Sequence, residues 1–349
     1  MARITDVARA AGVSPATVSR VLNRPDLVTE EKRDRVLAAV KALDYSPNAL
    51  ASGLRAGAVR TVALLVGDIS QPFQGAFAKA LSRHGESLGY KVLLCDLDHS
   101  EDRLIRLLGE FRTSDIYGVV LATADDLSTP PVLEAIAAAQ ARGIIVVSSS
   151  QEIDGRVPAI VPRYQAISHL ATLHLATQGR WPILFIGGSW RSPLSRERLG
   201  GFERACSELG YTDHPQWVLD GNFAVDQSRA AMEAVFARHA GIGLGEPGHP
   251  FGVVAINMRM AIGALQAASD RGLRVPQDMS LVCCEELPLA AEWRPTVTTV
   301  GVDFDAIAES SFASLLAGPE APERLYLPHR LIVRTSSIAS QEARERLSA

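Results

Sequence analysis

The residues with the clearest potential for molecular recognition lie near the amino terminus, between Ser14 and Arg20. Two small residues, Ala16 and Thr17, precede Arg20, and all three share the outward face of a predicted short helix. The Arg20 guanidinium can donate two parallel hydrogen bonds to O6 and N7 of a guanine. A helix with such a face can enter the major groove, so this segment is a candidate for contacts with DNA bases.

Two short helices joined by a tight turn are predicted to position this face. Their apolar faces consist of Ile4, Val7, Ala8 and Ala11 in the first helix and of Val18, Val21 and Leu22 in the second. Gly12 and Val13 lie in the turn. Ser14 can cap the second helix, and Pro15 presets its first φ angle. An ordinary helical hairpin is the alternative, but the cap, the glycine turn and the proline together favour a helix-turn-helix.

A third helix is expected from Glu30 to about Leu43. Thr29 is predicted to cap it, and Val36, Val40 and Leu43 are predicted to face a small core. The segment that follows, residues 46–57, is a weak helix, because it is short and contains a glycine at position 53. We therefore interpret it as a linker whose folding depends on its partners.

The charge of the chain is unevenly distributed. Over all 349 residues the net charge is −4, which by itself argues against binding to nucleic acid. Residues 1–60 carry a net charge of +4, however, and the remainder carries −8. Attraction to phosphates is local, because salt screens charges beyond roughly 10 Å. A basic segment on an acidic body is therefore typical of a tethered DNA-binding module.

Composition restricts the compartment and the kinds of site. The cysteines lack metal-ligand spacing and are expected to be reduced and mostly buried: Cys95, Cys206, Cys283 and Cys284. A redox role for the adjacent pair is the alternative, but its aliphatic neighbours favour burial. The histidines show no metal-binding spacing, so we predict neither a metal nor a cofactor. No secretory signal or membrane span is evident, and we expect a cytoplasmic protein without a membrane partner.

The remainder of the chain alternates short apolar runs with amphipathic helices. The predicted strands are Val62–Val66, Val92–Cys95, Gly118–Leu121, Ile144–Val147, Ile183–Ile186, Val253–Ile256 and Ser280–Cys283. The predicted helices include Phe77–Leu88, Val132–Arg142, Leu194–Leu209 and Met258–Arg271. Aliphatic strands separated by helices predict parallel sheets covered on both faces. A break near Gly155–Ala159 divides the series into two halves, with a ligand cleft expected between them at the strand carboxyl ends.

From residue 3 to about 336 the chain resembles the lac-repressor-type (LacI/GalR) transcription regulators. The strong matches are Thr5–Ala8, Val18–Asn23, Leu43–Asn48 and the spacing of Leu54, and the weaker ones are Ser70–Phe73, Arg198–Phe202, Gly221–Phe223 and Gly272–Asp278. The resemblance implies an α/β protein with an all-α helix-turn-helix head and a core of two doubly wound parallel-sheet subdomains, like periplasmic sugar-binding proteins. It also implies a bacterial homodimer, nucleoid-associated when bound to a palindromic double-stranded operator, that binds a small effector.

The implied boundaries are a DNA-binding domain at 1–45, a hinge helix or linker at 46–58, a core at 59–338 and a tail at 339–349. Within the core we expect an N-subdomain of about 59–157 plus 289–317 and a C-subdomain of about 158–288 plus 318–338. The residues that match DNA-contacting positions are Ser14, Pro15, Ala16, Thr17, Ser19, Arg20, Asn23, Thr29, Asn48, Leu54 and Arg55. Among them, Pro15, Ala16 and Arg20 match base-reading positions, and Leu54 matches a minor-groove wedge. Capping and ordinary helix packing are the alternative roles.

The positions that match effector contacts, with two plausible neighbours, are Phe73, Gln74, Ser149, Trp190, Arg198, Phe223, Asn257 and Glu285. Aromatic faces and forked hydrogen-bonding groups suit a sugar, a sugar acid or a glycoside. A place in the core, or a surface ion pair for Arg198, is the alternative. The chain departs from the family at Met258, where Asp is usual, and at Cys283–Glu285, where Gly, an aromatic residue and Asp are usual. These departures concern the effector and leave the fold prediction intact.

We therefore expect a repressor that a small effector releases from its operator, and not an enzyme. A corepressor-dependent regulator is one alternative. A solute-binding protein of transport shares the core architecture, but the predicted DNA-binding head speaks against it. A cytoplasmic sugar-processing enzyme is a third, less supported alternative.

Overall fold

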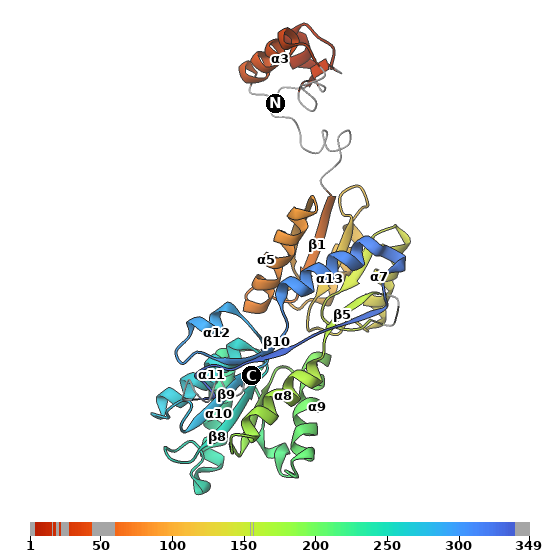
Figure 1. Cartoon of the computed structure of the whole chain (residues 1–349). Coiled ribbons are helices and arrows are strands. Elements are labelled where there is room, and N and C mark those ends of the chain that lie inside the picture. Colours follow the sequence, from red (N-terminus) through yellow and green to blue (C-terminus); the bar gives the residue numbers. More distant parts are fainter. Residues whose placement is uncertain are drawn as a thin grey trace. The chain divides into compact units, whose positions relative to one another are not determined.

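The structure is a computed structural model that describes residues 4–15, 17–18, 21, 28–43, 60–153, 155 and 157–338 (Figure 1). Contacts divide the chain into two compact units, Met1–Arg60 and Thr61–Ala349. The predicted linker at 46–58 and the tail at 339–349 lie outside the described residues.

The first unit contains α1 (Ile4–Ala11) and α3 (Glu30–Ala42), with further helical residues at positions 15, 17, 18 and 21. Gly12 has a φ of +62°, and the Val13 N–H donates to the Ala8 carbonyl over 3.0 Å, which closes the turn. The Thr17 N–H donates to Ser14 Oγ over 3.2 Å. The predicted cap and tight turn are thus present where the sequence placed them.

A small apolar core holds these helices together, formed by Val7, Ala8, Ala11, Val18, Val21, Val36 and Ala39. Two details differ from the prediction. Leu43 is 38% exposed, because α3 ends one residue earlier, and Ala39 is buried where Leu43 was expected. Thr29 occupies the N-cap position, but its side chain makes no capping hydrogen bond.

The first sheet of the second unit has the strand order β11-β5-β4-β3-β1-β2. Its strands are β1 (Arg60–Val66), β2 (Tyr90–Asp96), β3 (Gly118–Ala122), β4 (Ile145–Ser148), β5 (Ala159–Pro162) and β11 (Arg324–Leu327). The accompanying helices are α5 (Pro72–Ser87), α6 (Glu101–Glu110), α7 (Pro130–Ala141) and α13 (Phe304–Ala317). Beside this sheet, α5 packs against α13, and α6 packs against α7.

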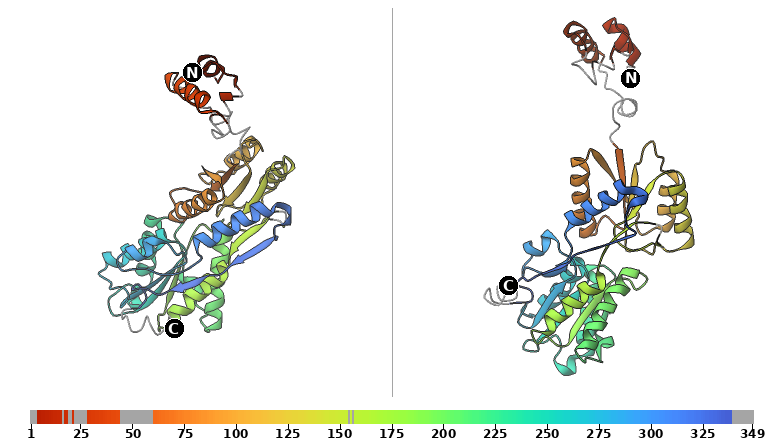
Figure 2. Two further views of the ribbon diagram at one scale, coloured as in Figure 1. Left: turned by 45° about the horizontal axis from the view of Figure 1, so that its top comes forward. Right: turned by 45° about the vertical axis from the view of Figure 1, so that its right-hand side comes forward.

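The second sheet has the strand order β12-β10-β9-β8-β6-β7. Its strands are β6 (Ile183–Gly187), β7 (Val218–Asp220), β8 (Phe251–Ala255), β9 (Met279–Cys283), β10 (Thr298–Gly301) and β12 (Arg330–Ile332). Its helices are α8 (Tyr164–Ala176), α9 (Pro193–Glu208), α10 (Val225–Arg238), α11 (Met258–Asp270) and α12 (Pro288–Glu292). Figure 2 shows this sheet and the first as two lobes of the core.

The central strands follow the predicted pattern. Every residue of β3, β6, β8 and β9 is buried, and these strands pair in parallel with their neighbours. Among the described pairings, β12 alone is antiparallel to its neighbour β10. Aliphatic strands in parallel sheets need cover on both faces, which the flanking helices provide. The predicted α/β class with two doubly wound sheets is confirmed.

The chain crosses between the two sheets three times: after β5, after β10 and after β11. The predicted subdomain boundaries placed β5 and β11 with the second sheet and β10 with the first, and the structure places each in the opposite sheet. Each of these strands has only four residues and lies beside a crossing, so the sequence carries little signal for them. No helix in the described part of the chain is long and apolar enough to cross a bilayer.

Candidate functional site

The predicted DNA-contacting residues fall into two groups. Ser14, Pro15 and Thr29 are exposed, and Thr17 is half-buried. Ser14 Oγ lies 2.9 Å from Thr17 Oγ1 as well as capping the helix, so the structure gives Ser14 the capping role that the sequence allowed. The remaining residues, Ala16, Ser19, Arg20, Asn23, Asn48, Leu54 and Arg55, lie outside the described residues.

Within the second unit, a cavity of about 670 Å³, including the space open to solvent, lies between the loops at the strand carboxyl ends of both sheets. The predicted effector residues that line it are Phe73, Gln74, Ser149, Arg198, Phe223, Asn257 and Glu285. The other lining residues with polar or aromatic side chains are Asp68, Gln71, His99, Thr123, Ser150 and Tyr164. The structure thus brings together seven of the eight predicted residues.

Trp190 is the exception. It does not line the cavity, and its indole lies so close to Gly187 that a Cβ there would approach the ring to 2.1 Å. Gly187 ends β6, so the indole covers the end of that strand and packs on the core. The sequence suggests Trp190 only as a plausible neighbour of the effector contacts, and in the structure its ring packs against Gly187 instead.

Arg198 projects from α9 and is only 8% exposed. Its guanidinium carbon lies 4.1 Å from the centre of the Tyr164 ring, and one terminal nitrogen donates to the Leu194 carbonyl over 3.4 Å. Its buried Nε has no hydrogen-bond partner. Stacking on an aromatic ring orients the guanidinium and leaves donor capacity directed at the cavity.

Asn257 and Glu285 form the wall at the amino terminus of α11. Asn257 Oδ1 accepts from the Met260 N–H over 2.8 Å, and Glu285 Oε2 accepts from the Met258 N–H over 3.1 Å. Burial raises the pKa of Glu285 to about 7, although the Arg198 charge and the Met258 N–H act in the opposite direction. Both side chains therefore cap a helix as well as line the cavity.

Aromatic side chains line opposite sides of the cavity. The Phe73 ring packs on Phe304, the first residue of α13, with ring centres 4.9 Å apart. The Phe223 ring lies against Gly188, where a Cβ would approach it to 2.2 Å. Phe223 also has a φ of +57°, a backbone conformation that costs about 1–3 kcal/mol for a residue with a side chain. That conformation is held by the surrounding contacts and directs the ring into the cavity.

A second polar group, at the strand carboxyl ends of the first sheet, was missed by the prediction. His99 Nδ1 lies 2.8 Å from Asp125 Oδ1, and the Thr123 hydroxyl donates to the other oxygen of Asp125 over 2.5 Å. The hydrogen bond to Asp125 raises the pKa of His99, which favours the imidazolium. Burial would raise the pKa of Asp125, but the bonds from His99 and Thr123 lower it overall. The charges of His99 and Asp125 therefore neutralise one another within the protein.

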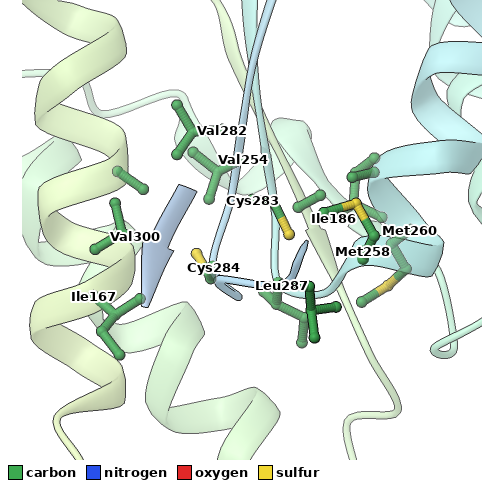
Figure 3. Close-up of a cluster of buried hydrophobic side chains, with 14 of the residues drawn as sticks. Ile167, Ile186, Val254, Met258, Met260, Val282, Cys283, Cys284, Leu287 and Val300 are labelled. Atoms are coloured by element: carbon green, nitrogen blue, oxygen red, sulfur yellow. The ribbon is translucent and has the colours of Figure 1, made fainter. Parts of the chain in front are cut away.

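Met258, Cys283 and Cys284, at which the sequence departs from the family pattern, lie in a cluster of buried apolar side chains (Figure 3). Cys283, Cys284 and Met258 are buried, and Figure 3 shows the two cysteines pointing to opposite sides of the strand. Burial raises the pKa of the Cys284 thiol to about 12 and that of Cys283 well above its usual range. Both thiols therefore remain protonated at neutral pH, which speaks against the redox alternative. Among the described residues, no cluster of histidine, cysteine or carboxylate side chains could hold a metal ion.

Three polar atoms on lining residues are buried without a partner: Gln74 Oε1, Ser150 Oγ and Arg198 Nε. Buried polar groups are normally hydrogen-bonded, so such atoms around one cavity indicate partners supplied by a bound molecule or by water. At the cavity rim, the Ser192 hydroxyl donates to the Ala124 carbonyl over 2.8 Å. Arg259 donates to Ser70 Oγ over 3.2 Å. These two bonds join a loop and helix α11 of the second sheet's lobe to loops of the first.

Comparison with known proteins agrees with this arrangement. A family model described as "Bacterial regulatory proteins, lacI family" matches residues 3–48, and one described as "Periplasmic binding protein-like domain" matches residues 172–337. The chain is 29% identical over 344 residues to the HTH-type transcriptional repressor PurR of Vibrio cholerae serotype O1, which covers 97% of this chain and 98% of that protein.

Two solved structures share the fold. The complex of the transcriptional regulator CelR with cellobiose has 25% identity and a TM-score of 0.67, covering 97% of this chain and 100% of that one. The lac repressor dimer bound to operator and the anti-inducer ONPF has 23% identity and a TM-score of 0.76, covering 97% and 99%. With its helix-turn-helix head and two-sheet core, the chain is similar over nearly its whole length to DNA-binding transcription regulators of the lacI family.

Proposed function

We propose that the protein represses transcription by binding a palindromic operator as a homodimer, and that a small sugar-like effector in the cavity releases it. Such a repressor acts in the cytoplasm, at the bacterial nucleoid. The observation that carries the effector proposal is the cavity between the two lobes, with unpartnered polar atoms on Gln74, Ser150 and Arg198. Supporting it, a relative with the same fold has been solved with cellobiose, and another relative is a transcriptional repressor.

The rim hydrogen bonds support a mechanism for release. Ser192 and Arg259 connect the two lobes beside the cavity, so a ligand that fills it will change the spacing or orientation of the loops that carry them. In the proposed dimer, this change makes the arrangement of the two linkers at 46–58 on DNA less favourable. Linkage then requires that operator DNA weaken effector binding by the same factor. A corepressor would act through the same elements, but its binding would strengthen operator binding instead of weakening it.

The experiment that tests the proposal begins with a DNA site selected from a random library by the full-length protein. Sugars, sugar acids and glycosides are then screened for a rise in the protein's melting temperature, because a ligand of the native state stabilises it. Each ligand found is added to the protein–operator complex, and fluorescence anisotropy reports release. Tighter operator binding on ligand addition would identify a corepressor. Failure to select any DNA site would contradict the proposal.

Arg20→Ala is expected to weaken operator binding by about 1–3 kcal/mol and to relax base preference at one base pair in each half-site. The reason is that the predicted reading face offers one forked donor among small residues. Affinities for a set of half-site variants at fixed salt provide the measurement. Arg9→Ala is the control, because Arg9 lies on α1 and is 83% exposed, so its loss is expected to leave base preference unchanged. Unchanged base preference in Arg20→Ala would remove Arg20 from this role.

A further inference from the structure

Arg198 is a buried cation that the protein does not neutralise. It is 8% exposed and forms no ion pair with any described carboxylate. Its direct contacts are the face of the Tyr164 ring and the Leu194 carbonyl, neither of which carries a formal charge, while the carboxyl groups of Glu197 and Glu285 lie close enough to interact with its charge. Buried charges in proteins are normally paired, because removing a charge from water is costly unless another charge or several hydrogen bonds compensate. A ligand that brings negative charge beside Arg198 would therefore offset this cost.

Two carboxyl groups line the cavity, and neither supplies this charge fully. Glu197, next to Arg198 in the chain, does not line the cavity, and burial raises its pKa as well. Asp68 is occupied locally: its oxygens accept from the Ser70 N–H and hydroxyl, each over 2.7 Å, and from Gln71 over 3.3 Å. Glu285 is engaged by the Met258 N–H, and burial raises its pKa to about 7. At neutral pH the Glu285 carboxyl is therefore protonated in a large part of the molecules. Asp125, nearby, is already paired with His99.

The unpartnered atoms of Gln74 and Ser150 indicate which other groups a bound molecule would carry. Gln74 Oε1 is an acceptor, so its partner must donate a hydrogen bond, and the Ser150 hydroxyl can donate or accept. A hydroxyl-bearing compound satisfies both. The rings of Phe73 and Phe223 offer apolar faces to the carbon skeleton of such a compound. An acceptor group with negative charge is still needed at Arg198.

We propose that the effector is a hydroxylated carboxylic acid, such as a uronic or aldonic acid, whose carboxylate binds the guanidinium of Arg198. Its hydroxyl groups bind Gln74 and Ser150. This inference rests on the proposed function, because it takes the cavity as the effector site. It goes further by selecting the acids from among the sugars, sugar acids and glycosides that the fold accommodates.

Matched pairs of probes test the charge requirement on the full-length protein. The pairs are glucuronate with glucose, galacturonate with galactose, and gluconate with sorbitol, each measured by thermal shift and by calorimetry. In at least one pair, the acid is expected to bind at least tenfold more tightly than its neutral counterpart. Equal or tighter binding of the neutral members would overturn the inference and leave the proposed repressor intact.

Two isosteric substitutions separate the roles of the charged groups. Arg198→Gln is expected to abolish acid binding. Glu285→Gln is expected to keep it within about threefold, because the amide oxygen can still accept from the Met258 N–H, as the carboxyl does over 3.1 Å. If the effector were a neutral polyol held by an ionised Glu285, the same substitution would remove most of the affinity. Loss of acid binding in Glu285→Gln with unchanged melting temperature would therefore contradict the inference.

The pH dependence provides a further readout. Acid binding by the wild type is expected to strengthen as the pH falls from 8 to 6, because protonation of Glu285, whose pKa is about 7, removes a negative charge near the ligand. Tyr164 and Cys284, also beside this site, remain neutral because burial raises the pKa of each to about 12, whereas protonation of Glu197, whose pKa burial also raises, acts in the same direction as that of Glu285. His99 faces the cavity from the first sheet and also gains positive charge as the pH falls, with its pKa raised by the hydrogen bond to Asp125. Glu285→Gln isolates the Glu285 contribution.

The outcomes also separate this inference from the proposed function. If none of the six probes changes the melting temperature, both the acid inference and the sugar-like effector are contradicted, while DNA-site selection still tests the regulator independently. If an acid binds but does not alter operator affinity, the inference stands and the proposed release mechanism fails. A pH dependence unchanged by Glu285→Gln would contradict the role assigned to Glu285.

Discussion

Replacing Arg198 with alanine is expected to abolish the influence of the effector on operator binding, while operator affinity without effector stays unchanged. Arg198 is 8% exposed, its Nε lacks a partner, and it lines the cavity. Removing one partner of a buried, hydrogen-bonded charge pair typically costs about 2–5 kcal/mol or more, which corresponds to at least a roughly 30-fold loss of affinity. Calorimetry with a ligand found by screening, together with anisotropy on operator DNA, measures both quantities.

Arg204→Ala is the matched control on the same helix. Arg204 is about half exposed, at 51%, and its ion pair with Glu208 lies four residues along the helix, away from the cavity. Exposed pairs of this kind contribute little, so effector affinity is expected to remain within about twofold. Wild-type effector affinity in Arg198→Ala would contradict the assignment of the cavity as the effector site.

Changing Gly201 to alanine is expected to destabilise the core by about 1–3 kcal/mol or more, as overpacking does. Gly201 lies in α9 where this helix packs against α8. A Cβ at this position would lie 2.1 Å from the Gln165 carbonyl oxygen and 2.3 Å from Ser168 Oγ. Backbone atoms of a packed helix cannot rotate aside as a flexible side chain can, so the two helices would have to move apart.

The neighbouring residue supplies a close control. A Cβ at Gly200 would meet only Gln165 Nε2, at 3.8 Å, which is an ordinary contact. Gly200→Ala is therefore expected to be neutral or to stabilise the protein by up to about 1 kcal/mol through helix propensity. Urea unfolding of both variants, with midpoints and slopes compared, measures the difference. Equal midpoints for the two variants would show that the helices tolerate the added methyl group.

Long aliphatic strands and amphipathic helices made the architecture predictable. The runs at Val62–Val66 and Val253–Ile256, for example, became β1 and β8, because only strands buried on both faces consist of such residues. The crossings were not predictable in the same way. Strand β10 reads Thr-Thr-Val-Gly, which is buried in the structure but is not an aliphatic run, and β11 begins with an exposed arginine, Arg324, so neither sequence assigns its strand to a sheet.

The candidate site was predicted more completely in one lobe than in the other. Arg198, Asn257 and Glu285 lie in segments that match the family pattern, and the structure gathers them around one cavity. His99 and Thr123 lack such a match, although each follows the end of a strand of the first sheet. Listing polar residues just beyond strand carboxyl ends would have found both, because ligands bind at that edge of parallel sheets. The orientation of Trp190 depends on a turn and its packing, which no local pattern specifies.

The repeated crossing of the chain between its two sheets has a consequence for how the protein is made. Strand β5 pairs with β11, in which Arg324 lies opposite Ala159. The β5 edge of the first sheet therefore stays uncovered until β11 has left the ribosome. During synthesis the nascent chain therefore presents an incomplete, apolar edge strand, which is a template for intermolecular pairing and aggregation. Premature termination after α13 would leave both sheets unfinished at once, since β11 and β12 are the last strands made. Neither lobe can be cut out of the gene as one continuous piece.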